Sequence, residues 1–216
     1  MECCQSDAIE EFMDREMAAK ELRSYRSRGP DKTTRILLDA LKEEGVRDST
    51  LLDIGGGVGA IQHEFLQAGC PEAISVDASS AYLEAARDEA RRHRHLDRLR
   101  QHHGDFVQLA KEVPSADVVT LDRVICCYDD MDSLVRLSAE RAKHLYGVVY
   151  PRDHALIKAF IWLENAYNRL RGSKFRAFVH ATEAVDAVIC SMRLGRVFAR
   201  NTLLWQVHVY RRSPFK

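Results

Sequence analysis

Short apolar runs alternate with longer amphipathic segments over the middle of the chain, a pattern typical of strands that alternate with helices. The runs are continuous rather than alternating in polarity, as in strands buried on both faces of a parallel sheet. We predict such strands at residues 51–54, 73–76, 117–121 and 145–150, with a poorer one at 99–103. Parallel strands need right-handed crossovers, and ligands in such folds bind beyond the carboxyl ends of the strands.

The last third of the chain follows a different pattern. Helical spacing covers about 153–170 and 182–193, and strand-like runs follow at 196–200 and 203–210. The two-residue link between these runs permits an antiparallel hairpin but no parallel crossover. The predicted fold class is therefore α/β, a doubly wound, seven-stranded and mostly parallel sheet that ends in an antiparallel hairpin.

Two helices are predicted before the first strand. Apolar residues recur at helical spacing through residues 7–28, the pair Gly29-Pro30 breaks this helix, and a second helix ends near Gly45. We expect residues 1–45 to form a helical cover on a domain of residues 46–216, within one compact unit. Spacing alone leaves two interpretations open, a cover over the ligand site and plain packing against the edge of the sheet.

Composition narrows the class of protein. With 216 residues the chain fits one domain, and its 32 basic and 32 acidic residues cancel, so no global field attracts nucleic acid or anionic membrane. No apolar run approaches the ~20 residues that span a bilayer, and the N-terminus lacks the order of a signal peptide. We expect a cytoplasmic protein with no nucleic-acid partner and no stable membrane insertion, and we leave a homodimer open.

Two features raise the question of metal or nucleic-acid binding. Residues 91–103 are rich in arginine and histidine, but acidic residues interrupt them and no aromatic residues interleave, so a solvated helix end is favoured over a nucleic-acid patch. The vicinal pairs Cys3-Cys4 and Cys126-Cys127 lack the C-x-x-C spacing of zinc sites. No metal site is expected.

The first predicted strand ends in a glycine run, Asp53-Ile-Gly55-Gly56-Gly57-Val-Gly59. Glycines let the backbone turn and let a bulky ligand approach the main chain, while the following helix directs its N-terminal amides to the same place. The spacing Gly55-x-Gly57-x-x-Ala60, with Asp77 about where a ribose-binding acid belongs, fits the dinucleotide fingerprint. An NAD-dependent oxidoreductase is therefore one interpretation.

The same run resembles motif I, E/DxGxGxG, of the class I S-adenosylmethionine-dependent methyltransferases, which typically also end in a β-hairpin. The resemblance implies a Rossmann-like fold and S-adenosyl-L-methionine as cofactor. It implies that the cofactor's methionyl, ribose and adenine parts meet residues at successive strand ends. The cofactor-binding residues expected from it are Asp53, Gly55, Gly56, Gly57, Gly59, Asp77, Ala78, Gly104, Asp105, Phe106 and Asp122, together with Arg28 of the first helix, which we expect at the cofactor carboxylate.

A closer resemblance follows the fourth strand. The string Leu121-Asp122-x-x-Ile125-x-x-Tyr128 resembles the corresponding segment of the magnesium-protoporphyrin O-methyltransferases, and this resemblance covers about 50–150. The sequence departs from that subfamily at Cys127, where the subfamily has a histidine before the tyrosine. The specificity is therefore left unassigned.

The function expected is methyl transfer from S-adenosylmethionine to an O, N or S nucleophile of a small molecule. A general base is needed only if that nucleophile carries a proton at neutral pH, and the catalytic candidates are Tyr128, His154 and His180. Two rivals remain, a non-catalytic module that binds the cofactor and the NAD-dependent oxidoreductase.

Overall fold

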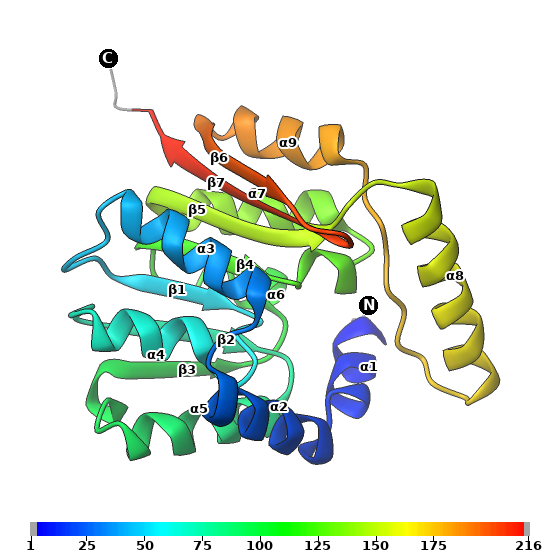
Figure 1. The fold of residues 1–216 in the computed structure, drawn as a ribbon, viewed down its shortest axis with the longest axis horizontal. Coiled ribbons are helices and arrows are strands. Elements are labelled where there is room, and N and C mark those ends of the chain that lie inside the picture. Colours follow the sequence, from blue (N-terminus) through cyan, green and yellow to red (C-terminus); the bar gives the residue numbers. More distant parts are fainter. Residues whose placement is uncertain (1–3, 214–216) are drawn as a thin grey trace.

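One seven-stranded sheet runs through the centre of the molecule (Figure 1). The computed structural model describes residues 4–213. The strands are β1 (Leu51–Ile54), β2 (Ala73–Asp77), β3 (Leu99–His103), β4 (Ala116–Asp122), β5 (Ala142–Pro151), β6 (Leu194–Asn201) and β7 (Trp205–Arg212). Every residue of β1 and β2 is buried, as their uninterrupted apolar runs predict.

The strand order is β3-β2-β1-β4-β5-β7-β6. The first five strands of this order are parallel, and β7 pairs antiparallel with both β5 and β6. This topology confirms the predicted Rossmann-like α/β class and its terminal hairpin. It also brings the carboxyl ends of β1, β2 and β4 side by side, because β1 lies between the other two.

Helices cover both faces of the sheet (Figure 1). One apolar cluster joins the sheet to α3 and α4, and a second joins it to α6, α7 and α9. The helices are α1 (Cys4–Phe12), α2 (Arg15–Arg28), α3 (Lys32–Glu43), α4 (Ala60–Gln67), α5 (Ser80–Arg92), α6 (Phe106–Leu109), α7 (Met131–Arg141), α8 (Ala155–Leu170) and α9 (Thr182–Ser191), with short 3₁₀ turns η1 (Leu96–Arg98) and η2 (Ile125–Cys127).

The N-terminal helix predicted at residues 7–28 is wrong in one respect, because it is two helices. Asp14 ends the continuity: its extended backbone starts α2, and its side chain accepts a hydrogen bond from the Met17 amide at 2.9 Å. Apolar residues on both sides of this break kept helical spacing, which masked it. We call α1 and α2 the N-terminal cover.

The N-terminal cover is attached to the start of α5. Ser79 Oγ donates to the Met13 carbonyl at 2.6 Å, and the Ser80 amide donates to Glu10 at 2.8 Å. Further along, Arg26 donates to the buried Glu89 carboxylate of α5 at 2.7 Å. The cover therefore lies beside the end of β2, where Asp77 stands.

The helix α8 is different from the others. It stands away from the sheet (Figure 1), and only Ile157 and Asn168 of its 16 residues are buried. Asn165 holds it to the following loop through two hydrogen bonds with the backbone of Ala177. Within the described part of the chain, no helix combines the length and the apolar character that crossing a bilayer requires.

Candidate functional site

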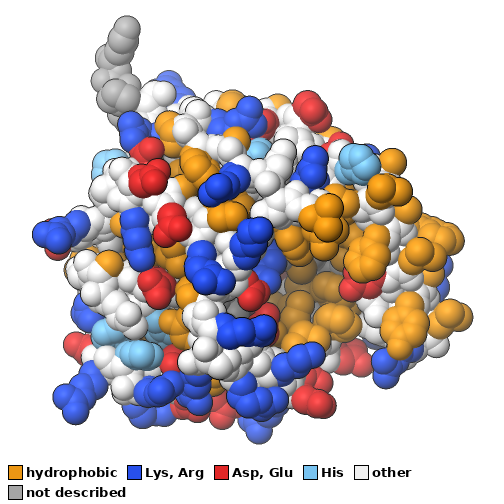
Figure 2. Space-filling view, in the orientation of Figure 1, with side chains coloured by type: hydrophobic (Ala, Val, Ile, Leu, Met, Phe, Trp, Pro, Cys, Tyr) orange, Lys and Arg blue, Asp and Glu red, His pale blue; other side chains and the backbone are white. Residues whose placement is uncertain are grey.

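A cavity of about 440 Å³ lies at the carboxyl ends of β1, β2 and β4. It opens as a hollow that hydrophobic side chains border on one side and charged side chains on the other (Figure 2). Polar groups gather on the side of the glycine loop, and apolar side chains from α1, α8 and the β6–β7 hairpin line the other side. The position agrees with the general location of ligand sites in open α/β sheets.

The glycine loop forms one wall of the cavity through Gly55, Gly56 and Gly57. Gly55 and Gly57 have φ of +62° and +57°, a backbone region that a side chain strongly disfavours. The Gly57 amide donates to Asp77 Oδ2 at 3.1 Å, so the loop is bound to the neighbouring strand end. Gly59 starts α4 but is not one of the lining residues.

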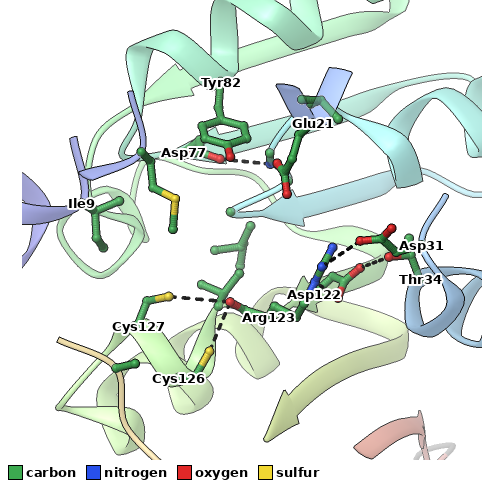
Figure 3. Close-up of a pocket in the computed structure, with 18 of the residues that line it drawn as sticks. Ile9, Glu21, Asp31, Thr34, Asp77, Tyr82, Asp122, Arg123, Cys126 and Cys127 are labelled. Carbon is green, nitrogen blue, oxygen red and sulfur yellow. Dashed lines mark hydrogen bonds and ion pairs between the residues drawn. The ribbon is translucent and has the colours of Figure 1, made fainter. Parts of the chain in front are cut away.

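Asp77 lines the cavity and is largely buried (Figure 3). Its second oxygen, Oδ1, accepts from the Ser79 amide at 2.8 Å, so both carboxylate oxygens are fixed in place. Burial raises the pKa of Asp77 to about 6, although the two amide donors favour the charged form. Each oxygen retains a lone pair for another donor, as recognition of a ribose diol requires.

Asp53 does not line the cavity, contrary to the expectation that its side chain meets the cofactor. It is fully buried under the glycine loop, where it accepts from Thr120 Oγ1 at 2.7 Å and from Gln62 Nε2 at 3.0 Å. Burial raises the pKa of its carboxyl to about 7 despite these donors. The pattern of the chain predicted that Asp53 stands at the end of β1, but not the side to which its side chain turns.

The adenine end of the expected site is present in part. Ala78, Gly104 and Phe106 line the cavity, and Phe106 is buried there. Asp105 does not line it. Its Oδ1 instead accepts from the Val107 amide at 2.9 Å and caps the short helix α6, so this carboxylate has a local structural partner.

Past the end of β4, an ionic cluster faces the cavity (Figure 3). Thr34 of α3 donates to Asp122 Oδ2 at 2.5 Å, and Arg123 bonds both Asp122 Oδ1 and Asp31 at 3.2 and 3.0 Å. Burial lowers the pKa of Arg123, but the charges of Asp122 and Asp31 outweigh it and raise the value. Arg123 has φ of +63°, an uncommon backbone for a residue with a side chain.

Arg123, and not Arg28, is the arginine of the cavity lining. The Arg28 guanidinium lies outside it and donates to Ser24 Oγ at 2.6 Å, within the exposed last turn of α2. The cover does reach the cavity through Glu21 and Tyr25. Sequence reasoning missed Arg123, although its place directly after the strand-end Asp122 was a signal for it.

The three catalytic candidates separate in the structure. Tyr128 lines the cavity. His180 does not line it and turns instead to the carbonyls of Ile125 and Tyr128, at 3.1 and 2.8 Å. His154 caps α8 through the Leu156 amide at 3.3 Å and also lies outside the lining. Of the three candidates, only Tyr128 therefore lines the cavity.

The apolar side of the cavity could not be read from local motifs. Phe12 of α1 stacks on Phe175 with ring centroids 4.4 Å apart and planes 10° apart. Further apolar walls come from Ile157, Phe160, Ile161 and Trp205. These side chains come from distant parts of the sequence, so no local motif joins them. The one indication in the sequence was that α8 carries more apolar residues than a single buried face needs.

Cys126 and Cys127 also line the cavity, and both thiols are directed at the Arg123 carbonyl, at 3.4 and 3.7 Å (Figure 3). Contact with Cys127 and burial raise the pKa of Cys126. Among residues 4–213, no cluster of three histidine, cysteine or carboxylate side chains has the arrangement of a metal site.

Comparison with known proteins shows what the chain is similar to. The family described as "Methyltransferase domain" matches residues 52–144. No curated protein sequence matches the chain significantly. Many solved structures match, and three are representative. Magnesium protoporphyrin IX methyltransferase from Synechocystis with bound SAM has a TM-score of 0.70 at 13% identity, over 98% of each chain.

An O-methyltransferase family protein from Burkholderia thailandensis has a TM-score of 0.71 at 17% identity, over 94% of this chain and 60% of that one. A putative sarcosine dimethylglycine methyltransferase from Galdieria sulphuraria has a TM-score of 0.66 at 13% identity, over 84% and 86%. At these identities the structural matches establish the fold, while the domain match covers the strands that carry the glycine loop and Asp77.

Proposed function

We propose that the chain methylates an O, N or S nucleophile of a small, largely apolar molecule, on the premise that its methyltransferase domain is of the class I S-adenosylmethionine-dependent kind. One observation carries the proposal. A single cavity of about 440 Å³ joins a polar part, which suits a nucleoside, to an apolar part, which suits an acceptor. A module that only bound the cofactor would not need the second part.

The polar part fits the cofactor through residues of three strand ends. Gly55 and Gly57 present their main chain to the cavity, and Asp77 presents two fixed oxygens that suit the ribose hydroxyls. Ala78, Gly104 and Phe106 would surround the adenine ring. Bound S-adenosylmethionine supplies a methyl group that is already activated by its sulfonium.

Asp53 would act on the cofactor through the loop and not by contact. Its carboxylate lies under Gly56 and joins β4 to α4 through Thr120 and Gln62. Asp53 would therefore act as a positioning residue for the glycine loop. Arg123 is the fixed cation of the cavity, held by Asp31 and Asp122, and would pair with a carboxylate of the cofactor or acceptor.

The apolar part would orient the acceptor and exclude water. Phe12 and Phe175 contribute a stacked pair to this part, and Ile157, Phe160 and Trp205 add further apolar walls. Alignment and desolvation are the main demands of a displacement at an activated methyl. If the acceptor carries a proton, Tyr128 is the one of the three sequence candidates that the cavity exposes to it.

The test has a binding arm and a transfer arm. In calorimetry, S-adenosylmethionine and its demethylated product should bind, whereas NADH should not. With methyl-labelled S-adenosylmethionine and fractionated small-molecule extracts, label should enter an apolar acceptor. Tight NADH binding without S-adenosylmethionine binding would contradict the premise. Tight S-adenosylmethionine binding with label entering only protein or nucleic acid would contradict the proposed acceptor.

A further inference from the structure

The helix α8 exposes far more apolar surface than its role in the cavity requires. Its outer face carries an apolar stripe of five residues at four- and three-residue spacing: Leu156, Phe160, Leu163, Tyr167 and Leu170. All five are more than half exposed, and Leu170 reaches 88%. A helix with an unpartnered stripe of this kind is found where another apolar phase covers it.

The apolar surface continues beyond the stripe. Leu203 and Leu204, in the turn between β6 and β7, are 83% and 44% exposed, and the main chain beside them bonds to Arg152 ahead of α8. Phe160 and Leu204 are also lining residues of the cavity. Figure 2 shows hydrophobic side chains gathered beside the hollow, on the side where α8 lies in Figure 1. We call α8 together with Leu203 and Leu204 the docking surface.

Trp162 shows what kind of partner would cover this surface. It is exposed but does not belong to the stripe, since one residue advances a helix by about 100° and Trp162 precedes Leu163. A single partner helix covers one stripe and would leave Trp162 in water. A lipid surface covers both sides of the helix and accommodates tryptophan and tyrosine at the level of the headgroups.

The local charge points to an anionic partner. Residues 152–176 contain six arginines and lysines and two acidic residues, a net charge of +4, whereas the whole chain is neutral. Arg169, Arg171 and Lys174 lie around the C-terminal end of the stripe and are exposed. Two copies of this segment would repel each other, while anionic headgroups would attract it.

The length of α8 sets its orientation. Its 16 residues extend about 24 Å, which is less than the hydrocarbon core of a bilayer, so it cannot cross one. It can lie in the plane of the interface with its apolar residues among the acyl chains.

We propose that the docking surface binds the face of an anionic lipid bilayer, with α8 lying along it and the cavity mouth directed at the lipid. From the net charge of the whole chain we expected no attraction to anionic membranes. That argument does not take account of a local cluster of basic residues. The proposal concerns docking and does not depend on methyl transfer.

The experiment measures co-flotation with vesicles of phosphatidylcholine and phosphatidylserine at a ratio of roughly 7 to 3, with phosphatidylcholine vesicles for comparison. The protein should float with the mixed vesicles and lose binding as salt rises. Leu163→Glu with Leu170→Glu should weaken partitioning roughly tenfold or more, because two apolar anchors become charged. Neither residue lines the cavity, so S-adenosylmethionine affinity by calorimetry should stay unchanged and report that the variant is folded.

The matched control is Leu96→Glu with Val197→Glu, two apolar residues that are 39% and 43% exposed outside the docking surface. It changes charge equally and should bind vesicles as the natural sequence does. Arg169→Gln with Arg171→Gln and Lys174→Gln should remove most of the preference for phosphatidylserine.

Three outcomes would overturn the proposal. The first is absence of flotation at low salt. The second is an equal loss in the control and docking-surface variants. The third is a dimer in sedimentation equilibrium that Leu163→Glu with Leu170→Glu dissociates, without vesicle binding, which would assign the surface to a second copy of the chain.

Discussion

The Asp53 carboxylate lies directly beneath Gly56, so close that a Cβ on this glycine would overlap Asp53 Oδ2. The same Cβ would also overlap Gln62 Nε2, which is hydrogen-bonded to Asp53. The glycine loop therefore packs directly on the buried pair of Asp53 and Gln62. It can approach them this closely because Gly56 has no side chain.

Gly56→Ala should for this reason displace the loop. We expect a loss of S-adenosylmethionine affinity of at least tenfold, together with a lower melting temperature, because neither Asp53 nor Gln62 has space to retreat. Gly195→Ala is the matched control, since nothing lies within 4 Å of the Cβ it would add. Unchanged affinity in Gly56→Ala would show that the loop does not hold the cofactor.

Asp77→Ala should weaken S-adenosylmethionine binding by roughly 1–3 kcal/mol, the usual consequence of leaving buried donors unpaired. The ribose hydroxyls lose both acceptor oxygens, and the Gly57 and Ser79 amides lose theirs as well. Calorimetry measures the difference. An affinity within experimental error of the natural sequence would rule out the ribose assignment.

The pKa of Asp77 also predicts how the affinity for S-adenosylmethionine depends on pH. Its pKa is raised to about 6, so the carboxyl is ionised above that pH and protonated below it. Only the ionised form offers acceptor oxygens on both sides, so affinity should fall as pH drops through 6, by roughly tenfold between pH 7.5 and 5. In Asp77→Asn the decline should be absent. If it persists there, the buried Asp53, with a pKa of about 7, is responsible.

The two arginines considered as partners of the cofactor carboxylate can be distinguished by mutation. Arg28→Ala should leave cofactor affinity unchanged, because this side chain is bonded within the last turn of α2. Arg123→Gln should weaken affinity or raise the KM for the acceptor, since it removes the fixed cation of the cavity lining. The reverse ranking would restore the expectation drawn from the sequence.

The sequence predicted what depends on local pattern. The buried runs ending in Gly55 and Asp77 identified both strands and their ligand-binding ends, because a parallel strand must be apolar along its whole length. The direction in which a side chain points after the strand end depends on partners that are distant in the sequence. Asp53 turned toward Thr120, and His180 toward the backbone of Ile125, because of partners 67 and 55 residues away.

Removal of residues 1–28 should leave a folded core with weaker cofactor binding and strongly reduced turnover. The cover supplies Glu21, Tyr25 and Phe12 to the cavity, whereas the two main apolar clusters contain none of its residues. Circular dichroism and turnover measure the two effects. Arg26→Ala is a milder variant, which removes the ion pair to Glu89 and leaves the chain entire. Undiminished turnover in the truncated protein would show that the N-terminal cover only packs against the domain and does not contribute to the site.

Cys127→Ser should retain methyl transfer and should not change the metal content of the purified protein. The reaction at a sulfonium needs no Lewis acid, and the two thiols share the Arg123 carbonyl. Elemental analysis alongside turnover is the measurement. Stoichiometric zinc that disappears together with activity in this variant would contradict the prediction.

Ser79 joins two events that are otherwise separate. Its amide fixes the Asp77 carboxylate, and its hydroxyl holds the Met13 carbonyl at the junction of α1 and α2. Occupancy of the nucleoside site and docking of the cover are therefore thermodynamically linked, and linkage is reciprocal. The factor by which bound nucleoside strengthens docking of the cover must equal the factor by which the docked cover tightens the nucleoside, and proteolysis at this junction measures the first factor when the cover opens and closes faster than it is cleaved. A protease and a binding isotherm thus report one coupling constant from opposite sides.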